Sequence, residues 1–185
     1  MAKAMKRKAG KAAKKSMKKP GRKAKKVQPI PEQHQGATPY LTIKGAAAAI
    51  DFYKKAFGAK EVTRMEMPPG MVMHAELKVG AARFMLAEEM EQMGGKSPRA
   101  LGGSPVTMML YVKNVDGFAA AAVAAGARIV HAVQNHFYGD RMGHLEDPYG
   151  HHWMVATHIE DVKPAELRKR AQALMQSARA SGAPA

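Results

Sequence analysis

Two predicted β-strands carry ionisable side chains at positions that face one side of a sheet: a histidine and a glutamate in the first, and a histidine in the second. His74 and Glu76 lie within residues 71–79, and His152 lies within residues 151–158. Side chains at positions i and i+2 of a strand face the same side of the sheet. A carboxylate beside a histidine selects its tautomer and raises its pKa, which suits general acid/base catalysis. We therefore predict His74, Glu76 and His152 as candidate catalytic residues.

Other interpretations of these three residues stay open. Two histidines and one glutamate could hold a non-standard metal, with His144 on the neighbouring strand. A polar strand face whose groups bond one another would need no function at all. The alternate apolar residues from Met71 to Val79 are expected to pack against helices, on the opposite face from His74. Three other histidines, at positions 131, 136 and 151, are expected at the surface or in loops.

The charge of the chain is concentrated at its start. The sequence has 185 residues, with 30 Lys+Arg, 15 Asp+Glu and a formal net charge of +15. Residues 1–28 hold 13 of the basic residues and no acidic one, so residues 29–185 are nearly neutral. Such a tail is expected to be disordered, followed by a linker at residues 29–37. Because the chain has no cysteine and no apolar run of about 20 residues, we expect a cytoplasmic protein.

The basic tail suggests a second kind of partner. Clustered positive charge gives non-specific, salt-dependent binding to nucleic acid or another polyanion. No aromatic residue lies among the basic ones, so base stacking is not indicated. A solvated tail that only aids solubility is the alternative. The predicted nucleic-acid contacts are Lys14, Lys15, Lys18, Lys19, Arg22, Lys23, Lys25 and Lys26.

The elements that would position these residues follow a repeated order. Periodicity and turn signals predict β-α-β-β-β twice, then a final helix. The predicted strands are residues 39–44, 61–66, 71–79, 83–87, 106–112, 128–133, 142–146 and 151–158. The predicted helices are residues 46–57, 115–125 and 164–178. Gly94-Gly95 and Gly102-Gly103 mark a linker between the two passes.

The two passes also resemble each other residue by residue. Residues 56–62 match residues 124–130 at an offset of 68, which indicates a duplicated supersecondary unit. We predict an α+β domain over residues 38–162, with modules at 38–90 and 105–162. Residues 163–185 would form a C-terminal helix and tail. Helices on one face of a sheet leave the other face free to line a cavity.

Six motifs give the chain a family resemblance. They are PYL at residues 39–41, IDFYKKAFGA at 50–59, HAEL at 74–77, YGDR at 138–141, DPYGHHW at 147–153 and ATHIEDV at 156–162. In this order and spacing they resemble the vicinal oxygen chelate superfamily, which includes glyoxalase I, bleomycin-resistance proteins and extradiol dioxygenases. The PhnB-like branch is the most similar. The resemblance implies two βαβββ modules that curve a mixed sheet around a cavity, often in a homodimer.

The metal ligands of that superfamily are absent from their usual positions. Its metalloenzymes use His, Gln or Glu from the first and last strands of each module. The resemblance places these four positions on Thr38, Met85, Thr107 and Met154. Neither residue type is a usable ligand for a hard or borderline divalent metal. We therefore predict no metal and no other cofactor, which counts against glyoxalase I and dioxygenase activity.

The same cavity is expected to bind a small molecule. Methionine adapts to irregular apolar ligands, although ordinary core filling would also explain it. Arg141 could clamp a carboxylate or phosphate at two points, or form an internal salt bridge that holds its loop. The predicted ligand-binding residues are Met85, Met109, Tyr111, Arg141, Met154 and His158.

Three functions follow from these features. The leading one is a homodimeric, glyoxalase/bleomycin-resistance-like protein that binds a small molecule without the standard divalent metal. The first alternative is a lyase- or oxygenase-type enzyme that uses His74, Glu76 and His152 as an acid/base or non-standard metal centre. The second is a nucleic-acid-associated protein that acts through residues 1–28. The sequence does not identify the ligand.

Overall fold

The computed structural model describes residues 27–180, apart from the side chain of residue 178. The chain divides into residues 1–35 and residues 36–185. The predicted nucleic-acid contacts, and most of the predicted disordered tail, lie outside the described residues. No helix within residues 27–180 combines the length and apolar character needed to cross a bilayer.

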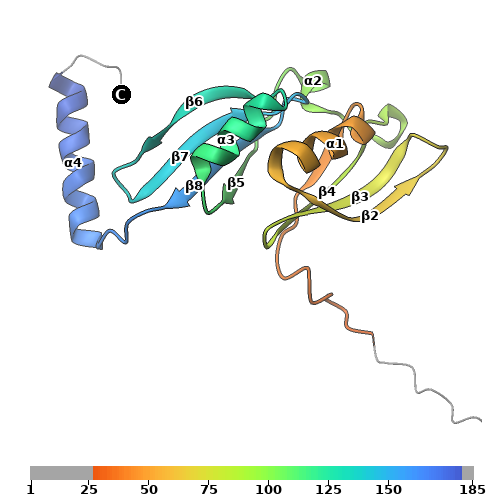
Figure 1. Cartoon of the computed structure of the whole chain (residues 1–185), viewed down its shortest axis with the longest axis horizontal. Coiled ribbons are helices and arrows are strands. Elements are labelled where there is room, and N and C mark those ends of the chain that lie inside the picture. The colour runs from red at the N-terminus through yellow and green to blue at the C-terminus, as the bar shows by residue number, and fades with distance from the viewer. Residues whose placement is uncertain (1–26, 181–185) are drawn as a thin grey trace, which may run out of the picture. The chain divides into compact units, whose positions relative to one another are not determined.

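The first module is a helix over a mixed four-stranded sheet (Figure 1). Its elements are β1 (Tyr40–Ile43), α1 (Ala46–Phe57), β2 (Lys60–Glu66), β3 (Val72–Val79) and β4 (Ala82–Glu88). The strand order is β1-β4-β3-β2. Only the β1/β4 pair is parallel. We call this sheet A.

The second module repeats the arrangement. Its elements are β5 (Thr107–Tyr111), α3 (Val115–Ala124), β6 (Arg128–Asn135), β7 (Asp140–Glu146) and β8 (His152–His158). The strand order β5-β8-β7-β6 has the same pattern as the first sheet, and we call it sheet B. A C-terminal helix, α4 (Pro164–Ala180), follows. The predicted α+β fold of two βαβββ modules is confirmed.

The segment between the modules has more structure than a plain linker. It contains a 3-10 turn, η1 (Glu91–Met93), and a short helix, α2 (Pro98–Leu101). Ser97, the N-cap residue of α2, is buried, and its backbone N–H donates to the Glu89 carboxylate at 2.7 Å. Helix α2 was not predicted from the sequence, because its four residues are too few to show the apolar periodicity of a helix.

Local signals explain where the long helices begin and end. Helix α1 ends at Gly58, whose φ of +61° lies in the left-handed region that favours glycine. At its start, the Glu88 carboxylate accepts hydrogen bonds from the backbone N–H groups of Gly45 and Ala46. Helix α3 begins at Asn114, whose side chain accepts from Gly117 N at 3.0 Å. The Glu88 contacts join the start of α1 to β4, whereas the Asn114 contact caps α3 locally.

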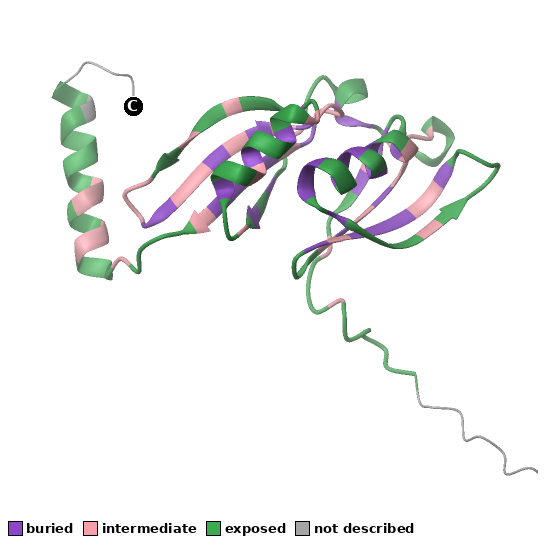
Figure 2. Ribbon diagram, in the orientation of Figure 1, coloured by how far each residue is buried: buried purple, intermediate pink, exposed green. Residues whose placement is uncertain are grey.

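The two modules share one aromatic core. Helix α1 contributes Tyr53 and Phe57, which contact Trp153 of β8 at ring-centroid distances of 5.8 and 5.0 Å. Phe57 also lies 4.8 Å from Phe118 of α3. Burying each such side chain stabilises the fold by about 1.5–3 kcal/mol. Helix α1 covers one face of sheet A and helix α3 covers one face of sheet B, and buried residues of the core lie on these elements (Figure 2).

The opposite side of each sheet, which we call its open face, carries most of the candidate site residues. On β5, Met108 and Leu110 are buried in the core, while Met109 and Tyr111 alternate with them and are exposed. Residues that pair across neighbouring strands point to the same side of a sheet, so the strand registers identify the other residues on each open face. The open face of sheet A includes Tyr40, His74, Glu76 and Met85. The open face of sheet B includes Met109, Tyr111, Asp140, Met142, His144, His152, Met154 and His158.

One expectation about the core is wrong. Met71 was expected to pack against the helices, but it precedes β3 and is exposed, whereas Val72 is fully buried. A register shift between Met65 and Glu66 in the β2/β3 pairing places Val72 opposite Glu66. This irregularity changes which residue at the start of β3 turns inward. The extra residue of this bulge is Met73 of β3 itself, because one step along β2 spans two steps along β3. Simple alternation does not reveal where such an extra residue interrupts a strand.

Candidate functional site

A chain of polar side chains crosses the open face of sheet B from β5 to the end of β8. The Tyr111 hydroxyl donates to Asp140 Oδ2 at 2.7 Å. The other oxygen of Asp140 lies 2.7 Å from His158 Nδ1. His158 Nε2 lies 3.0 Å from Asp161 Oδ1, so each nitrogen of the ring has a carboxylate partner. Two predicted ligand-binding residues, Tyr111 and His158, are thereby brought together by Asp140.

The carboxylates favour the charged form of His158. Its pKa is raised, first by the hydrogen bond to Asp140 and then by Asp161. The hydrogen bond to Asp140 also raises the pKa of Tyr111, which therefore keeps its proton. Burial raises the pKa of Asp140, but the bonds from Tyr111 and His158 outweigh it, and the net shift is downward. The site thus places the His158 ring between two carboxylates, which favour its protonated form.

Methionines flank this polar chain. Met109 lies directly opposite Met154 in the parallel β5/β8 pair, and Met154 lies opposite His144 in the β8/β7 pair. Met109 is 45% exposed, whereas Met154 is partly buried. The site therefore joins polarisable apolar surface to a fixed hydrogen-bonding group.

A row of three histidines lies on the same face. His144 Nε2 is 3.1 Å from His152 Nδ1, and their ring centroids are 5.0 Å apart. His131 of β6 lies on the other side of His144, with a centroid distance of 5.5 Å. Burial lowers the pKa of His144, and the neighbouring rings of His152 and His131 lower it further. Glu146 and Arg128 act on it more weakly and in opposite directions.

The two histidine environments predict opposite titrations. In a nuclear magnetic resonance titration, the His158 ring should titrate above the ordinary histidine pKa of about 6.5, and the His144 ring below it. By linkage, the His144 contribution to stability is present above pH 6.5 and is lost as the pH falls. The His158 contribution is present below pH 6.5 and is lost as the pH rises. Coincident titration of both rings would contradict the described contacts.

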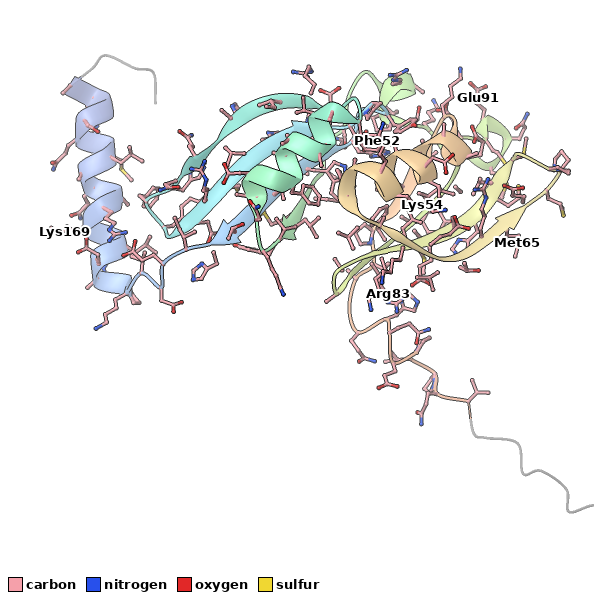
Figure 3. The ribbon with its side chains drawn as sticks, viewed as in Figure 1. Phe52, Lys54, Met65, Arg83, Glu91 and Lys169 are labelled. Atoms are coloured by element: carbon pink, nitrogen blue, oxygen red, sulfur yellow. The ribbon has the colours of Figure 1, made fainter. Side chains whose placement is uncertain are left out.

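The predicted catalytic residues do not form one cluster. On sheet A, His74 Nδ1 bonds the Tyr40 hydroxyl at 3.0 Å. Glu76 forms an ion pair with Arg83 of β4, which is labelled in Figure 3. His152 lies on sheet B, beside His144. Within residues 27–180, no group of three or more His, Cys, Asp or Glu side chains could hold a metal ion. An acid/base role for these residues stays a prediction.

Arg141 has its guanidinium engaged within the domain. It donates two hydrogen bonds to the Asp116 carboxylate of α3, at 2.8 and 2.6 Å, and a third to Asn135. The structure therefore contains the internal salt bridge, one of the two interpretations of this residue. Its side chain ties β7 to α3, on the helix side of the sheet.

The four positions where related enzymes hold a metal do not suit one. Thr38 precedes β1, Met85 lies opposite Tyr40, and Met154 lies opposite Met109. Thr107 begins β5, opposite His152. Two hydroxyls and two thioethers are poor donors for a divalent ion that usually takes imidazole and carboxylate ligands.

Sequence reasoning missed two residues of the site and the burial of His151. Asp140 and Asp161 were not predicted as site residues, although Asp140 lies on the same face of β7 as His144. Asp161 follows β8 in a loop, where periodicity carries no information. His151 was expected at the surface or in a loop; it lies in the turn before β8, which begins one residue later, but it is buried there, with 6% exposed.

Comparison with known proteins identifies relatives of this fold. The family model for the glyoxalase/bleomycin resistance protein/dioxygenase superfamily matches residues 37–155. The uncharacterized protein Mb0911c of Mycobacterium bovis is 43% identical over 134 residues, which cover 71% of this chain and 88% of that protein.

Solved structures show the same architecture. The At5g48480 gene product of Arabidopsis thaliana is 29% identical, with a TM-score of 0.54, over 66% of this chain and 98% of that one. A PhnB protein from Bacillus cereus is 20% identical, with a TM-score of 0.50, over 66% of this chain and 99% of that one. The second resemblance concerns the fold alone.

Proposed function

Because this chain belongs to the glyoxalase/bleomycin resistance protein/dioxygenase superfamily, we propose that it binds a small organic molecule on the open face of sheet B. The observation that carries the proposal is the Tyr111–Asp140–His158–Asp161 chain beside Met109 and Met154. Ligand sites combine apolar surface with a few fixed polar groups that orient the ligand. This face offers both.

The charges of the site indicate the chemistry of the ligand. With His158 protonated, the two carboxylates leave the site with one net negative charge. Both ring nitrogens of His158 already have partners, so the acceptors still available are lone pairs of Tyr111 and the carboxylates. Thioethers and the Tyr111 ring suit a flat or irregular apolar body. The proposed ligand is therefore a compact molecule with apolar surface and a hydrogen-bond donor or positive charge.

The proposal does not use the divalent metal of related enzymes. The residues at the usual ligand positions are threonine and methionine, and sequestration of a ligand needs no reaction. The enzymatic alternative is not better supported, because His74 and Glu76 lie on sheet A while His152 lies on sheet B. Binding without chemistry is therefore the simpler account.

We further propose that the protein is a PhnB-like homodimer. The open faces leave large apolar side chains in solvent, among them Tyr40 (53% exposed), Met65 (60%) and Tyr111 (59%). Exposed apolar surface of this kind favours association. A second copy laid against these faces would shield them and enclose the ligand. The six sequence motifs that carry the family resemblance support the branch.

The proposal predicts that two carboxylates placed on the apolar part of the open face will weaken the binding of a neutral apolar molecule. Nile red, a neutral apolar dye, should bind the wild-type protein and fluoresce. Met109→Glu together with Met154→Glu should weaken its binding at least about tenfold, because an ionised group resists desolvation by an apolar ligand. Fluorescence titration measures the effect.

A matched control separates this from a general effect of charge. Val123 and Ile129 are also exposed apolar residues, but they lie on the helix side of module 2. Val123→Glu together with Ile129→Glu should leave dye binding within about twofold of the wild type. Equal weakening by both double variants would count against the open face as the site.

A further inference from the structure

A cavity lies at the junction of the two modules, apart from the polar chain on sheet B. Its volume is about 350 Å³, within the usual range of small-molecule sites. The walls come from the start of β1, from α2 and from the segment that leads into β5. Most of the lining is apolar: Pro39, Leu41, Pro98, Leu101, Pro105, Val106 and Met108. Such a cavity favours an apolar occupant.

One buried polar side chain lines this cavity. His151 is only 6% exposed, and its Nε2 has no hydrogen-bond partner among residues 27–180. A buried polar atom without a partner loses about 1–3 kcal/mol relative to one that is bonded. Burial lowers the pKa of His151, so the ring is neutral near pH 7. A hydrogen bond to the Thr42 backbone engages the other ring nitrogen as a donor, which leaves Nε2 as an acceptor.

The walls around His151 are held in place by other contacts. The backbone N–H of His151 donates to Asp147 Oδ1 at 3.0 Å. Arg99 of α2 bonds the Pro148 carbonyl, and Gly150 approaches Pro98 so closely that a Cβ there would lie 3.1 Å from the proline. These contacts fasten α2 to the turn that carries His151. A preformed cavity loses little conformational entropy when it binds a ligand.

We propose that this cavity is a second binding site, for a small and largely apolar organic molecule whose hydroxyl group hydrogen-bonds to the His151 imidazole. The hydroxyl supplies the partner that the ring lacks, and the apolar body fills the space between β1, α2 and the entry to β5. Lys96 also lines the cavity and is exposed. An acidic substituent at that end would therefore be tolerated. The site is independent of the ligand proposed for sheet B.

A phenol and its methyl ether, matched in shape, test the proposal. With the full-length protein, 4-ethylphenol should perturb the nuclear magnetic resonance signals of the His151 ring and the Met108 methyl group. The methyl ether 4-ethylanisole, which can accept but not donate a hydrogen bond, should bind about three- to tenfold more weakly. Equal affinity of the two compounds, or shifts confined to other residues, would overturn the proposal.

Two variants locate the site. His151→Phe should remove the preference for the phenol over its ether, while His131→Phe, at an exposed histidine on β6, should keep it. Leu101→Trp fills the cavity from a residue that is 60% exposed, so it tests occupancy even if His151→Phe does not fold. It should reduce binding of both compounds at least about tenfold. Unchanged binding in Leu101→Trp would contradict the assignment, whatever the result for His151→Phe.

Discussion

Replacing Asp147 with asparagine is expected to lower the free energy of unfolding by about 3 kcal/mol, the largest effect of any single polar substitution that we predict. For a domain of this size, the melting temperature should fall by about 10 °C. Thermal and urea denaturation followed by circular dichroism measure both quantities. The reason is that this one carboxylate bonds four donors from both modules.

The geometry around Asp147 explains the size of the effect. Asp147 Oδ2 accepts from the Tyr53 hydroxyl at 2.6 Å and from Trp153 Nε1 at 3.0 Å. Its Oδ1 accepts from the backbone N–H groups of Tyr149 and His151. An asparagine amide oxygen could keep the two backbone donors, but its NH₂ group would face the Trp153 N–H, which can only donate. A buried donor would be left without a partner.

Two control substitutions separate this explanation from a loss of charge. Tyr53→Phe removes only one of the four donors and should lower stability by about 1 kcal/mol. Asp51→Asn makes the same chemical change on the exposed side of α1 and should stay within about 0.5 kcal/mol of the wild type. If Asp147→Asn lowered the free energy of unfolding as little as Asp51→Asn, the four hydrogen bonds to Asp147 would not stabilise the fold as proposed.

Replacing Asp140 with asparagine should disorganise the candidate site on sheet B. The carboxylate is 4% exposed and bonds both Tyr111 and His158. Asparagine removes the charge that holds the His158 proton, so the pKa of His158 should fall and that of Tyr111 should move back toward its ordinary value. The loss of two good hydrogen bonds should lower stability by about 1–2 kcal/mol. Titration by nuclear magnetic resonance detects the pKa changes directly.

The pH dependence gives this variant a signature that a general loss of packing would not. In the wild type, the raised pKa of His158 adds stability that is present below pH 6.5 and disappears as the pH rises through the folded-state value. Asp140→Asn should flatten that part of the stability profile. Asp116→Asn, which disrupts the exposed Arg141 ion pair instead, should leave it unchanged. An unaltered His158 titration in Asp140→Asn would contradict the assigned contacts.

Much of the fold could be predicted from local patterns. Helix α1 was predicted with its observed bounds, because its apolar periodicity ends at Gly58. The strands were located to within about two residues at either end. The module repeat followed from an internal match at constant spacing. These signals are local, so they need no knowledge of tertiary contacts.

The site was predicted less completely, because it depends on contacts between distant residues. Strand parity placed His74 and Glu76 on one face of their strand, but parity does not reveal that Glu76 pairs with Arg83 or that His152 lies on the other sheet. Asp140 belongs to the YGDR motif, yet its partners come from β5 and β8. Pairing across strands is set by tertiary structure.

Native mass spectrometry of the purified protein, after incubation with a cellular metabolite extract, tests the central claim most directly. It reports subunit number, divalent-metal adducts and organic adducts together. We expect a dimer that carries a small organic molecule and no divalent metal, and loss of the organic adduct when Met109 and Met154 are both replaced by glutamate. One tightly held divalent metal per chain that survives a chelator, or an organic adduct unchanged in that double variant, would contradict the account.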